Sequence, residues 1–196
     1  MKPALFLILT LLAATPSPAQ PKPAVPSSKP SADSQLYRNP ALGFSFRIPY
    51  GWVDRTKDLQ EGNEAQKGQV LLAIFERPPQ AAGETINSAV VIAVESAAAY
   101  PGLKKTEDCL VLLTDPTTSK GFKAEGDPSL IEIDARQLVR ADFTKPLSDK
   151  LTMHQSTLVL LAKGQIVSFT FLAGSEDEVS DLIARLSFTP PKSRAQ

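Results

Sequence analysis

The sequence predicts an α+β domain, in which a largely antiparallel β-sheet is covered by helices. Three observations predict this fold class. Short β-rich segments follow one another through short turns. A strong helical pattern closes the chain, after residue 175. Residues 36–189 are long enough for one domain that buries about 70% of its unfolded surface.

The first strands are predicted from their apolar spacing. Phe44, Phe46 and Ile48 alternate with polar residues, which is typical of a strand with one buried face. The runs Gln69–Phe75 and Ser88–Glu95 are continuously apolar. Continuous runs of this length are typical of strands that are covered on both faces, so we expect both to be central strands.

A helix is predicted to begin near Thr106, whose hydroxyl can cap it. Glu107 and Asp108 follow it, and acidic side chains are stabilising there because the start of a helix is the positive end of its dipole. Cys109, Leu110 and Leu113 would then share one face, and Pro116 would end or bend the helix. The same run is apolar enough to suit a strand as well.

The second half of the domain is predicted to be rich in strands joined by tight turns. Asp134 and the pair Lys163-Gly164 mark the turns of two hairpins, and the glycine can supply the positive φ of a tight turn. The predicted strands are Ser129–Ile133, Arg136–Phe143, Leu151–Ala162 and Gln165–Leu172.

The last helix has a predicted start and a predicted buried face. Ser175 and Glu178 match a capping box, in which each side chain satisfies an amide at the helix start. The apolar residues that follow recur at helical spacing and would pack on the sheet. They are Val179, Leu182, Ile183 and Leu186.

The two ends of the chain are predicted to lie outside the domain. Residues 1–19 combine a basic start, an apolar run and small residues at Ser17 and Ala19, which is the pattern of a cleaved signal peptide. Residues 20–35 are rich in proline and serine and predict a disordered linker. Residues 190–196 predict a flexible tail. We therefore expect an exported protein, periplasmic or extracellular, with no stable membrane insertion after cleavage.

Charge and cysteine content exclude several classes of protein. Removing Lys2 with the signal leaves 20 Lys and Arg against 21 Asp and Glu, so no strong positive field exists for nucleic acid. A single cysteine cannot form an internal disulfide. The sequence contains no glycine-rich phosphate loop and no Gly-x-Ser-x-Gly elbow. We assign no catalytic, cofactor-binding or metal-binding residue from the sequence, and we expect no cofactor.

Two segments resemble a known family of domains. The segment from Tyr37 to Trp52 resembles the first hairpin of the PsbP-like and DcrB-like domains, and Lys163 to Phe188 is similar to their last strands and C-terminal helix. The resemblance implies an α/β/α sandwich around an antiparallel sheet. It also implies a non-enzymatic role in binding or assembly, but no binding residue can be carried over one by one.

His154 and Cys109, the only histidine and the only cysteine of the chain, are candidates for a catalytic or metal-binding role. His154 is the only histidine, so a catalytic triad or a histidine metal site would depend on it. No second ligand type lies at a suggestive spacing, and an ordinary strand histidine is the favoured interpretation. Cys109 is interpreted as a small buried hydrophobic residue, with a reactive thiol as the alternative.

Two groups of charged residues are also interpreted as structural. Glu176-Asp177-Glu178 with Asp181 offers carboxylates to a divalent cation, but acidic residues at a helix start also complement its dipole. Arg140 and Asp142 lie two apart on one predicted strand, hence on one face, and are expected to pair with each other or with Arg136.

Two functions from different classes remain. The favoured hypothesis is a non-catalytic binding or assembly module of the cell envelope, monomeric, with a protein partner. The alternative is a small-ligand carrier or minor enzyme, whose site is assembled from residues that are distant in sequence. Enzymatic activity is the less favoured interpretation.

Overall fold

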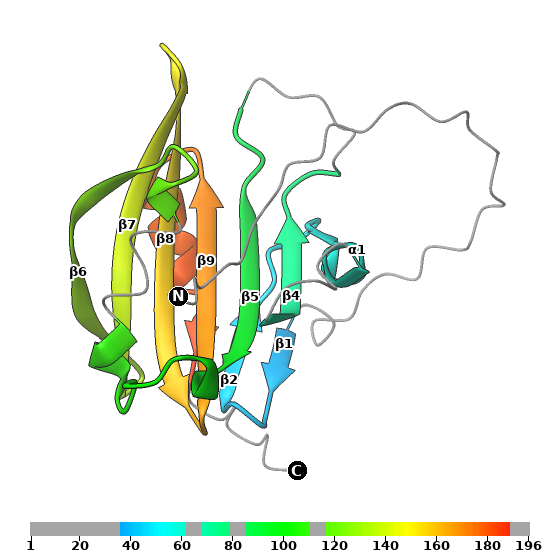
Figure 1. Ribbon diagram of the computed structural model, residues 1–196. Coiled ribbons are helices and arrows are strands. Elements are labelled where there is room, and N and C mark those ends of the chain that lie inside the picture. Colours follow the sequence, from blue (N-terminus) through cyan, green and yellow to red (C-terminus); the bar gives the residue numbers. More distant parts are fainter. Residues whose placement is uncertain (1–35, 62–67, 79–84, 110–116, 189–196) are drawn as a thin grey trace, which may run out of the picture.

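The computed structural model describes residues 36–61, 68–78, 85–109 and 117–188 (Figure 1). The predicted signal peptide, linker and tail lie outside these residues. So do Leu110, Leu113 and Pro116 of the helix that was predicted to begin near Thr106. Among the residues that the structure describes, no helix has the length and apolar character that a membrane crossing requires.

The main structural unit is a seven-stranded sheet in which every neighbouring pair is antiparallel. Its strand order is β3-β4-β5-β9-β8-β7-β6. The strands are β3 Val53–Asp54, β4 Gly68–Phe75, β5 Ala89–Ser96, β6 Lys123–Ile133, β7 Arg136–Ser148, β8 Leu151–Ala162 and β9 Gln165–Ala173. This arrangement confirms the predicted α+β fold around a largely antiparallel sheet, and it shows a domain dominated by that sheet.

A second, three-stranded sheet joins the two ends of the described domain. Its order is β1-β2-β10, and its strands are β1 Leu36–Asn39, β2 Phe44–Arg47 and β10 Leu186–Ser187. Phe46 of β2 lies opposite Leu186 of β10. Neither β1 nor β10 has a clear sequence pattern, because strands of two to four residues show too few alternations.

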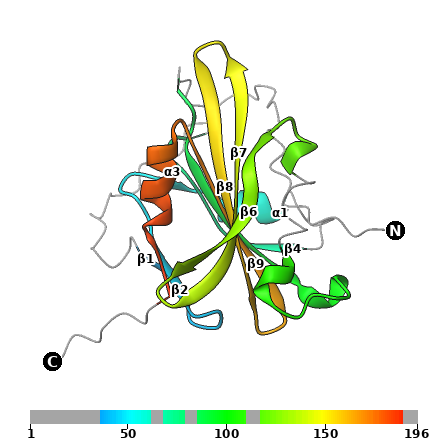
Figure 2. The same ribbon diagram turned by 90° about the vertical axis from the view of Figure 1, so that its left-hand side faces the viewer.

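The helices are short. They are α1 Thr56–Glu61, α3 Glu176–Ile183 and the 3-10 turns η2 Ala97–Ala99 and η3 Thr106–Cys109. Figure 2 views the large sheet near its β6 edge, with α3 and the small sheet on one side and α1 on the other. Helices thus form only part of each covering layer, and strands supply much of the layer that contains α3.

The largest hydrophobic core lies between the large sheet and the layer of α3 and the small sheet. Phe46, Phe169 and Phe171 are fully buried there, and the Phe44 and Phe169 rings meet edge to face with centroids 5.0 Å apart. The opposite face is covered near η3 by a cluster that contains Cys109 and Phe143, and near α1 by a cluster that contains Phe75. Both faces of β5 are therefore buried, as its continuous apolar run predicted.

The two predicted hairpins are present, with two-residue turns. Asp134 and Ala135 both have positive φ, 49° and 60°, between β6 and β7. Lys163 and Gly164 have φ of 51° and 72° between β8 and β9. Positive φ at both central residues is the turn geometry that matches the twist of hairpin strands.

The start of the last helix is confirmed, but its predicted end is wrong. Ser175 Oγ accepts a hydrogen bond from the Glu178 backbone amide, as a capping residue does. The helix ends at Ile183, however, and Leu186 is buried in β10 instead of continuing the helical face. Pairing of β10 with β2 satisfies backbone groups in this segment, and Leu186 reaches the same core from a strand.

Two further local expectations differ from the structure. The Thr106 hydroxyl was expected to cap a helix, but its Oγ1 accepts a hydrogen bond from the Leu161 amide. The backbone amides of Lys104 and Lys105 donate to the Asp108 carboxylate. The described part of this segment is a 3-10 turn. Ser45, which was expected on the exposed face of its strand, is buried because β2 lies between β1 and β10.

Candidate functional site

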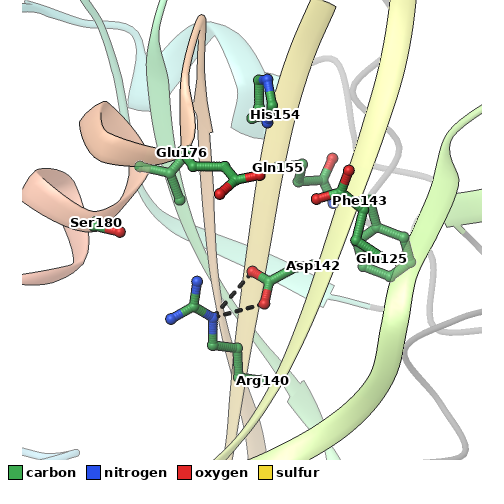
Figure 3. Close-up of a pocket in the computed structure, with 9 residues that line it drawn as sticks. Glu125, Arg140, Asp142, Phe143, His154, Gln155, Glu176 and Ser180 are labelled. Carbon is green, nitrogen blue, oxygen red and sulfur yellow. Dashed lines mark hydrogen bonds and ion pairs between the residues drawn. The ribbon is translucent and has the colours of Figure 1, made fainter.

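A polar pocket of about 190 Å³ lies between the start of α3 and the outer strands of the large sheet. Figure 3 shows the side chains that line it. Five of them carry ionisable groups and come from four elements, β6, β7, β8 and α3. These five are Glu125, Arg140, Asp142, His154 and Glu176.

Strand register brings these residues onto one face of the sheet. Asp142 of β7 lies opposite Ser156 of β8 on one side and opposite Glu125 of β6 on the other. His154 is two residues from Ser156, and Arg140 is two residues from Asp142. Because side chains alternate along a strand, the four strand residues of the pocket point to the face that α3 covers, and Glu176 approaches them from α3.

Arg140 and Asp142 form the pair that the sequence predicted. The Arg140 Nε lies 3.0 Å and 2.9 Å from the two carboxylate oxygens of Asp142. About a third of each side chain is exposed, so the pair contributes little to the stability of the fold. The pair engages the Arg140 guanidinium, which is the only guanidinium among the described residues that line the pocket.

Glu125, His154 and Glu176 converge on one point of the pocket. Each offers one ligand atom, and the three atoms lie within 4.8 Å of one another. In Figure 3 the Glu176 carboxylate extends from α3 toward the strands, while the Glu125 carboxylate and the His154 ring approach from the sheet. The two glutamates are exposed and the histidine is half-buried.

Two buried polar atoms of β8, one in this cluster and one two residues along the strand, have no hydrogen-bond partner among the described residues. They are Nδ1 of His154 and Oγ of Ser156. Ser156 is fully buried, and both residues belong to the same face of β8. Buried polar atoms in native proteins nearly always find a partner, so the unpaired nitrogen of His154 marks this pocket as unusual.

The start of α3 determines which of its acidic residues faces the pocket. The Glu178 carboxylate accepts from Ser88 Oγ at 2.5 Å and from the Gly174 amide at 3.3 Å. The predicted capping box is thus modified, since Glu178 reaches the residue before the cap. Glu178 therefore ties α3 to Ser88, directly before β5, and Glu176, about half a turn earlier, lines the pocket.

Cys109 lies away from the pocket, in the cluster on the opposite face of the sheet. It is fully buried, which confirms the favoured interpretation. Burial, followed by the charges of Asp108 and Glu107, raises the pKa of the thiol to about 11. A thiol with such a pKa is almost entirely protonated at neutral pH and is a poor nucleophile.

Tyr100 and Glu95 form a buried hydrogen bond on the same face of the sheet as Cys109. The phenol donates a hydrogen bond of 2.6 Å to the Glu95 carboxylate. Burial is the main cause that raises the pKa of Tyr100 far above its ordinary value, and the bond to Glu95 and its charge add to this. The pair is satisfied within the protein, so we interpret it as part of the core.

The sequence identified some of the residues of the pocket but not their assembly. His154, Arg140, Asp142 and Glu176 were each considered, and each was interpreted as structural. Glu125 was missed, because Gly126 and Pro128 interrupt the strand pattern upstream of Ser129. The structure absorbs the interruption in a bulge between Glu125 and Ser129, with Gly126 at φ of 72°.

No protein-family model matches the chain, and no curated protein matches it in sequence. Solved structures similar to it include a protein from Bacteroides thetaiotaomicron, at 11% identity and a TM-score of 0.44, over 82% of this chain and 50% of that one. The chain therefore spans half the length of that protein.

Two further similar structures have descriptive names. Cyanobacterial PsbP (CyanoP) from Synechocystis matches at 15% identity and a TM-score of 0.49, over 78% of this chain and 90% of that one. LpqN, which is involved in cell envelope biogenesis of Mycobacterium tuberculosis, matches at 16% identity and a TM-score of 0.42, over 75% and 83%. A PsbP structure is thus among those similar to this chain, as the sequence resemblance predicted.

Proposed function

We propose that this protein is a non-catalytic binding module of the cell envelope, and that the pocket between α3 and β6–β8 is its binding site. Export is proposed from the signal-peptide pattern of residues 1–19. The Pro/Ser-rich residues 20–35 would act as a linker that lets the domain reach a partner.

One observation carries the choice of site. The pocket gathers three carboxylates and one guanidinium around a half-buried imidazole, whose buried Nδ1 lacks a partner among the described residues. An unpaired buried polar atom costs free energy in the folded protein. A ligand with positive charge would offset the excess of carboxylates in the pocket.

The size of the pocket limits the ligand. Sites for drug-sized molecules occupy about 300–1,000 Å³. At about 190 Å³, this pocket fits an ion or the tip of a cationic side chain better than an organic metabolite. This comparison favours a binding module over the carrier of a small organic molecule.

The scaffold keeps the strand-borne groups in fixed positions. His154 lies between two long neighbours, β7 and β9, and its backbone pairs with Thr144 and Ala173. Arg140 and Asp142 belong to a strand of 13 residues that is paired on both sides. Such preorganisation lowers the entropic cost of binding, because little of the backbone has to be ordered.

Site-specific photo-cross-linking in the native envelope tests this proposal. The reactive group replaces Ser180, which is exposed at the rim of the pocket, and in a control it replaces Lys57, which is exposed on α1 at the other side of the sheet. We expect a defined protein adduct from position 180 and none from position 57. Deleting residues 21–30 should reduce the adduct, since the linker would no longer span the distance.

Three results would overturn the proposal. Equal adducts from both positions would show that the pocket is not the binding surface. A monomer without adducts that retains a small organic molecule through purification, seen by native mass spectrometry, would favour the carrier. An activity that falls by two or more orders of magnitude in His154→Ala or Asp142→Ala would favour an enzyme.

A further inference from the structure

We propose that Glu125, His154 and Glu176 form a binding site for a divalent transition-metal ion, with Zn²⁺ as the best-suited ion. The inference rests on the proposed function, because it identifies the ligand class of the same pocket. The three residues come from β6, β8 and α3 and meet at one point.

The donor set selects the class of metal. An imidazole nitrogen with two carboxylate oxygens suits Zn²⁺ and neighbouring first-row ions. Ca²⁺ prefers six to eight oxygen ligands, and Mg²⁺ an octahedron of oxygens, so the imidazole disfavours both. The thiol of Cys109 belongs to the cluster on the other face of the sheet and cannot join this set.

The geometry requires only a small closure. In a tetrahedral Zn²⁺ site with bonds of about 2.0–2.1 Å, neighbouring ligand atoms lie about 3.3 Å apart. The ligand atoms of the three residues lie within 4.8 Å of one another. Both glutamates are exposed, and their side chains can rotate toward the histidine while the backbone stays in place.

Charge in the pocket favours the same ligand. Arg140 is engaged with both oxygens of Asp142. No other cationic side chain among the described lining residues pairs with the carboxylates of Glu125 and Glu176. These two carboxylates lie close to each other and to the histidine, so their negative charges repel. A divalent cation between them would replace this repulsion with attraction.

His154 provides an observation that is independent of the acidic residues. Its buried Nδ1 has no hydrogen-bond partner among the described residues, and neither has the buried Oγ of Ser156 on the same strand face. A histidine that only fills a strand would normally have its buried nitrogen paired. An imidazole with an unpartnered ring nitrogen, placed with two carboxylates, is an arrangement that a metal ion would complete.

Three protein ligands leave one tetrahedral position open. In known zinc sites the open position takes water or a group from a bound molecule. The open side of this cluster faces the pocket, where Gln155 and Ser180 lie. A donor atom from a partner could therefore complete the coordination, which would make binding of that partner dependent on the metal.

Calorimetric titration of the chelator-treated mature protein tests the site. We expect one Zn²⁺ per chain, Mn²⁺ bound more weakly and Ca²⁺ weakest. His154→Gln, Glu125→Gln and Glu176→Gln should each lower the Zn²⁺ affinity at least tenfold. Glu132→Gln is the matched control, since Glu132 is exposed on the same strand as Glu125 and lies opposite Gln137, outside the pocket. It should bind as the unchanged protein does.

The single histidine gives a second, direct readout. Only one imidazole is present, so its NMR signals are assigned without ambiguity, and Zn²⁺ should shift them in proportion to occupancy. Circular dichroism and metal-free melting temperatures close to those of the unchanged protein would establish that the variants fold.

The possible outcomes separate this inference from the proposed function. Absence of Zn²⁺ binding, tighter binding of Ca²⁺ than of Zn²⁺, or equal affinity in the pocket variants and Glu132→Gln would overturn the metal site. A protein adduct from position 180 would then still support the binding module. Zn²⁺ binding at the three residues without any adduct would support the metal site and reject the partner.

Discussion

Cys109 is the residue for which sequence and structure agree most directly. It is fully buried and its pKa is raised to about 11 by burial and by nearby acidic charge. We expect a thiol reagent to leave it unmodified in the native protein at pH 8 and to modify it fully in denaturant. Rapid labelling of the native protein, or a disulfide-linked dimer on a non-reducing gel, would contradict this expectation.

Tyr100 predicts how stability depends on alkaline pH. Its pKa is raised in the folded state above the value of about 10 in the unfolded chain. The folded state therefore favours the protonated phenol, whose contribution is fully present below pH 10 and is lost as the pH rises further.

The comparison with Tyr100→Phe measures this contribution. At pH 7 the variant should lose about 1–3 kcal/mol, because the Glu95 carboxylate, which is 8% exposed, loses its donor. In urea unfolding the difference between the two proteins should shrink from pH 10 to pH 11.5. A difference that stays constant over this range would contradict the assignment.

His154 shows why a site can be considered in the sequence and still not be found. Its partners lie 29 residues before it and 22 residues after it, at spacings that match no local ligand motif. Only the register of β6 on β7 and the docking of α3 bring them together. The residue types were visible, but their proximity depends on pairings between strands that no single segment specifies.

At the scale of elements, α3 was predicted well at its start and poorly at its end. The cap at Ser175 is a local interaction that residue type and spacing indicate. The end is decided by β2, which pairs with Leu186 from more than a hundred residues away. A helical period also fits Leu186, so the pattern alone could not exclude a longer helix.

Two substitutions separate the roles of the cap and the buried face of α3. Ser175→Ala should lower the free energy of unfolding by about 1 kcal/mol, because the Glu178 amide loses its acceptor. Leu182→Ala should cost more, about 2–5 kcal/mol, since Leu182 is 3% exposed in the main core. Chemical denaturation measures both, and equal small losses would mean that α3 does not pack as described.

The β6–β7 turn offers a stabilising substitution. Ala135 has a φ of 60°, which costs an alanine about 1 kcal/mol more than a glycine. We expect Ala135→Gly to raise the free energy of unfolding by about that amount, as the turn becomes the favoured Asp-Gly pair.

The other hairpin provides the control for this turn. Gly164 has a φ of 72° at the same position, and a Cβ there would meet no atom within 4 Å. Gly164→Ala should therefore destabilise through backbone strain alone, by about 1–2 kcal/mol. Thermal unfolding would contradict the turn geometry if the two changes shifted the melting temperature in the same direction.

At the scale of the whole molecule, the sequence predicted a largely antiparallel sheet, but neither its strand order nor the strands in the layer above it. Leu151–Ala162 is predicted to the residue, because the turn residues Lys163-Gly164 fix its end and the chain before it also turns. The three-stranded sheet was not predicted, since Leu36–Asn39 and Leu186–Ser187 become strands only by pairing with β2. Tertiary contacts, and not local preference, determine these segments.

The predicted export of the whole molecule has a simple test. The mature protein should begin at Gln20, because Ser17 and Ala19 provide the small residues that a signal peptidase requires. Intact-mass spectrometry of protein from the envelope fraction measures the start directly. A mass that still includes Met1 would contradict cleavage and favour an uncleaved anchor.

The pairing of β10 with β2 joins residues that the ribosome makes far apart in time. Leu186 is incorporated 140 residues after Phe46, its opposite in the small sheet. At a synthesis rate of about 5–20 residues per second, this interval is roughly 7–28 s. Throughout it, the phenylalanines of β2 have neither their third strand nor Phe188 beside them. The small sheet can therefore be completed only after nearly the whole polypeptide has been made.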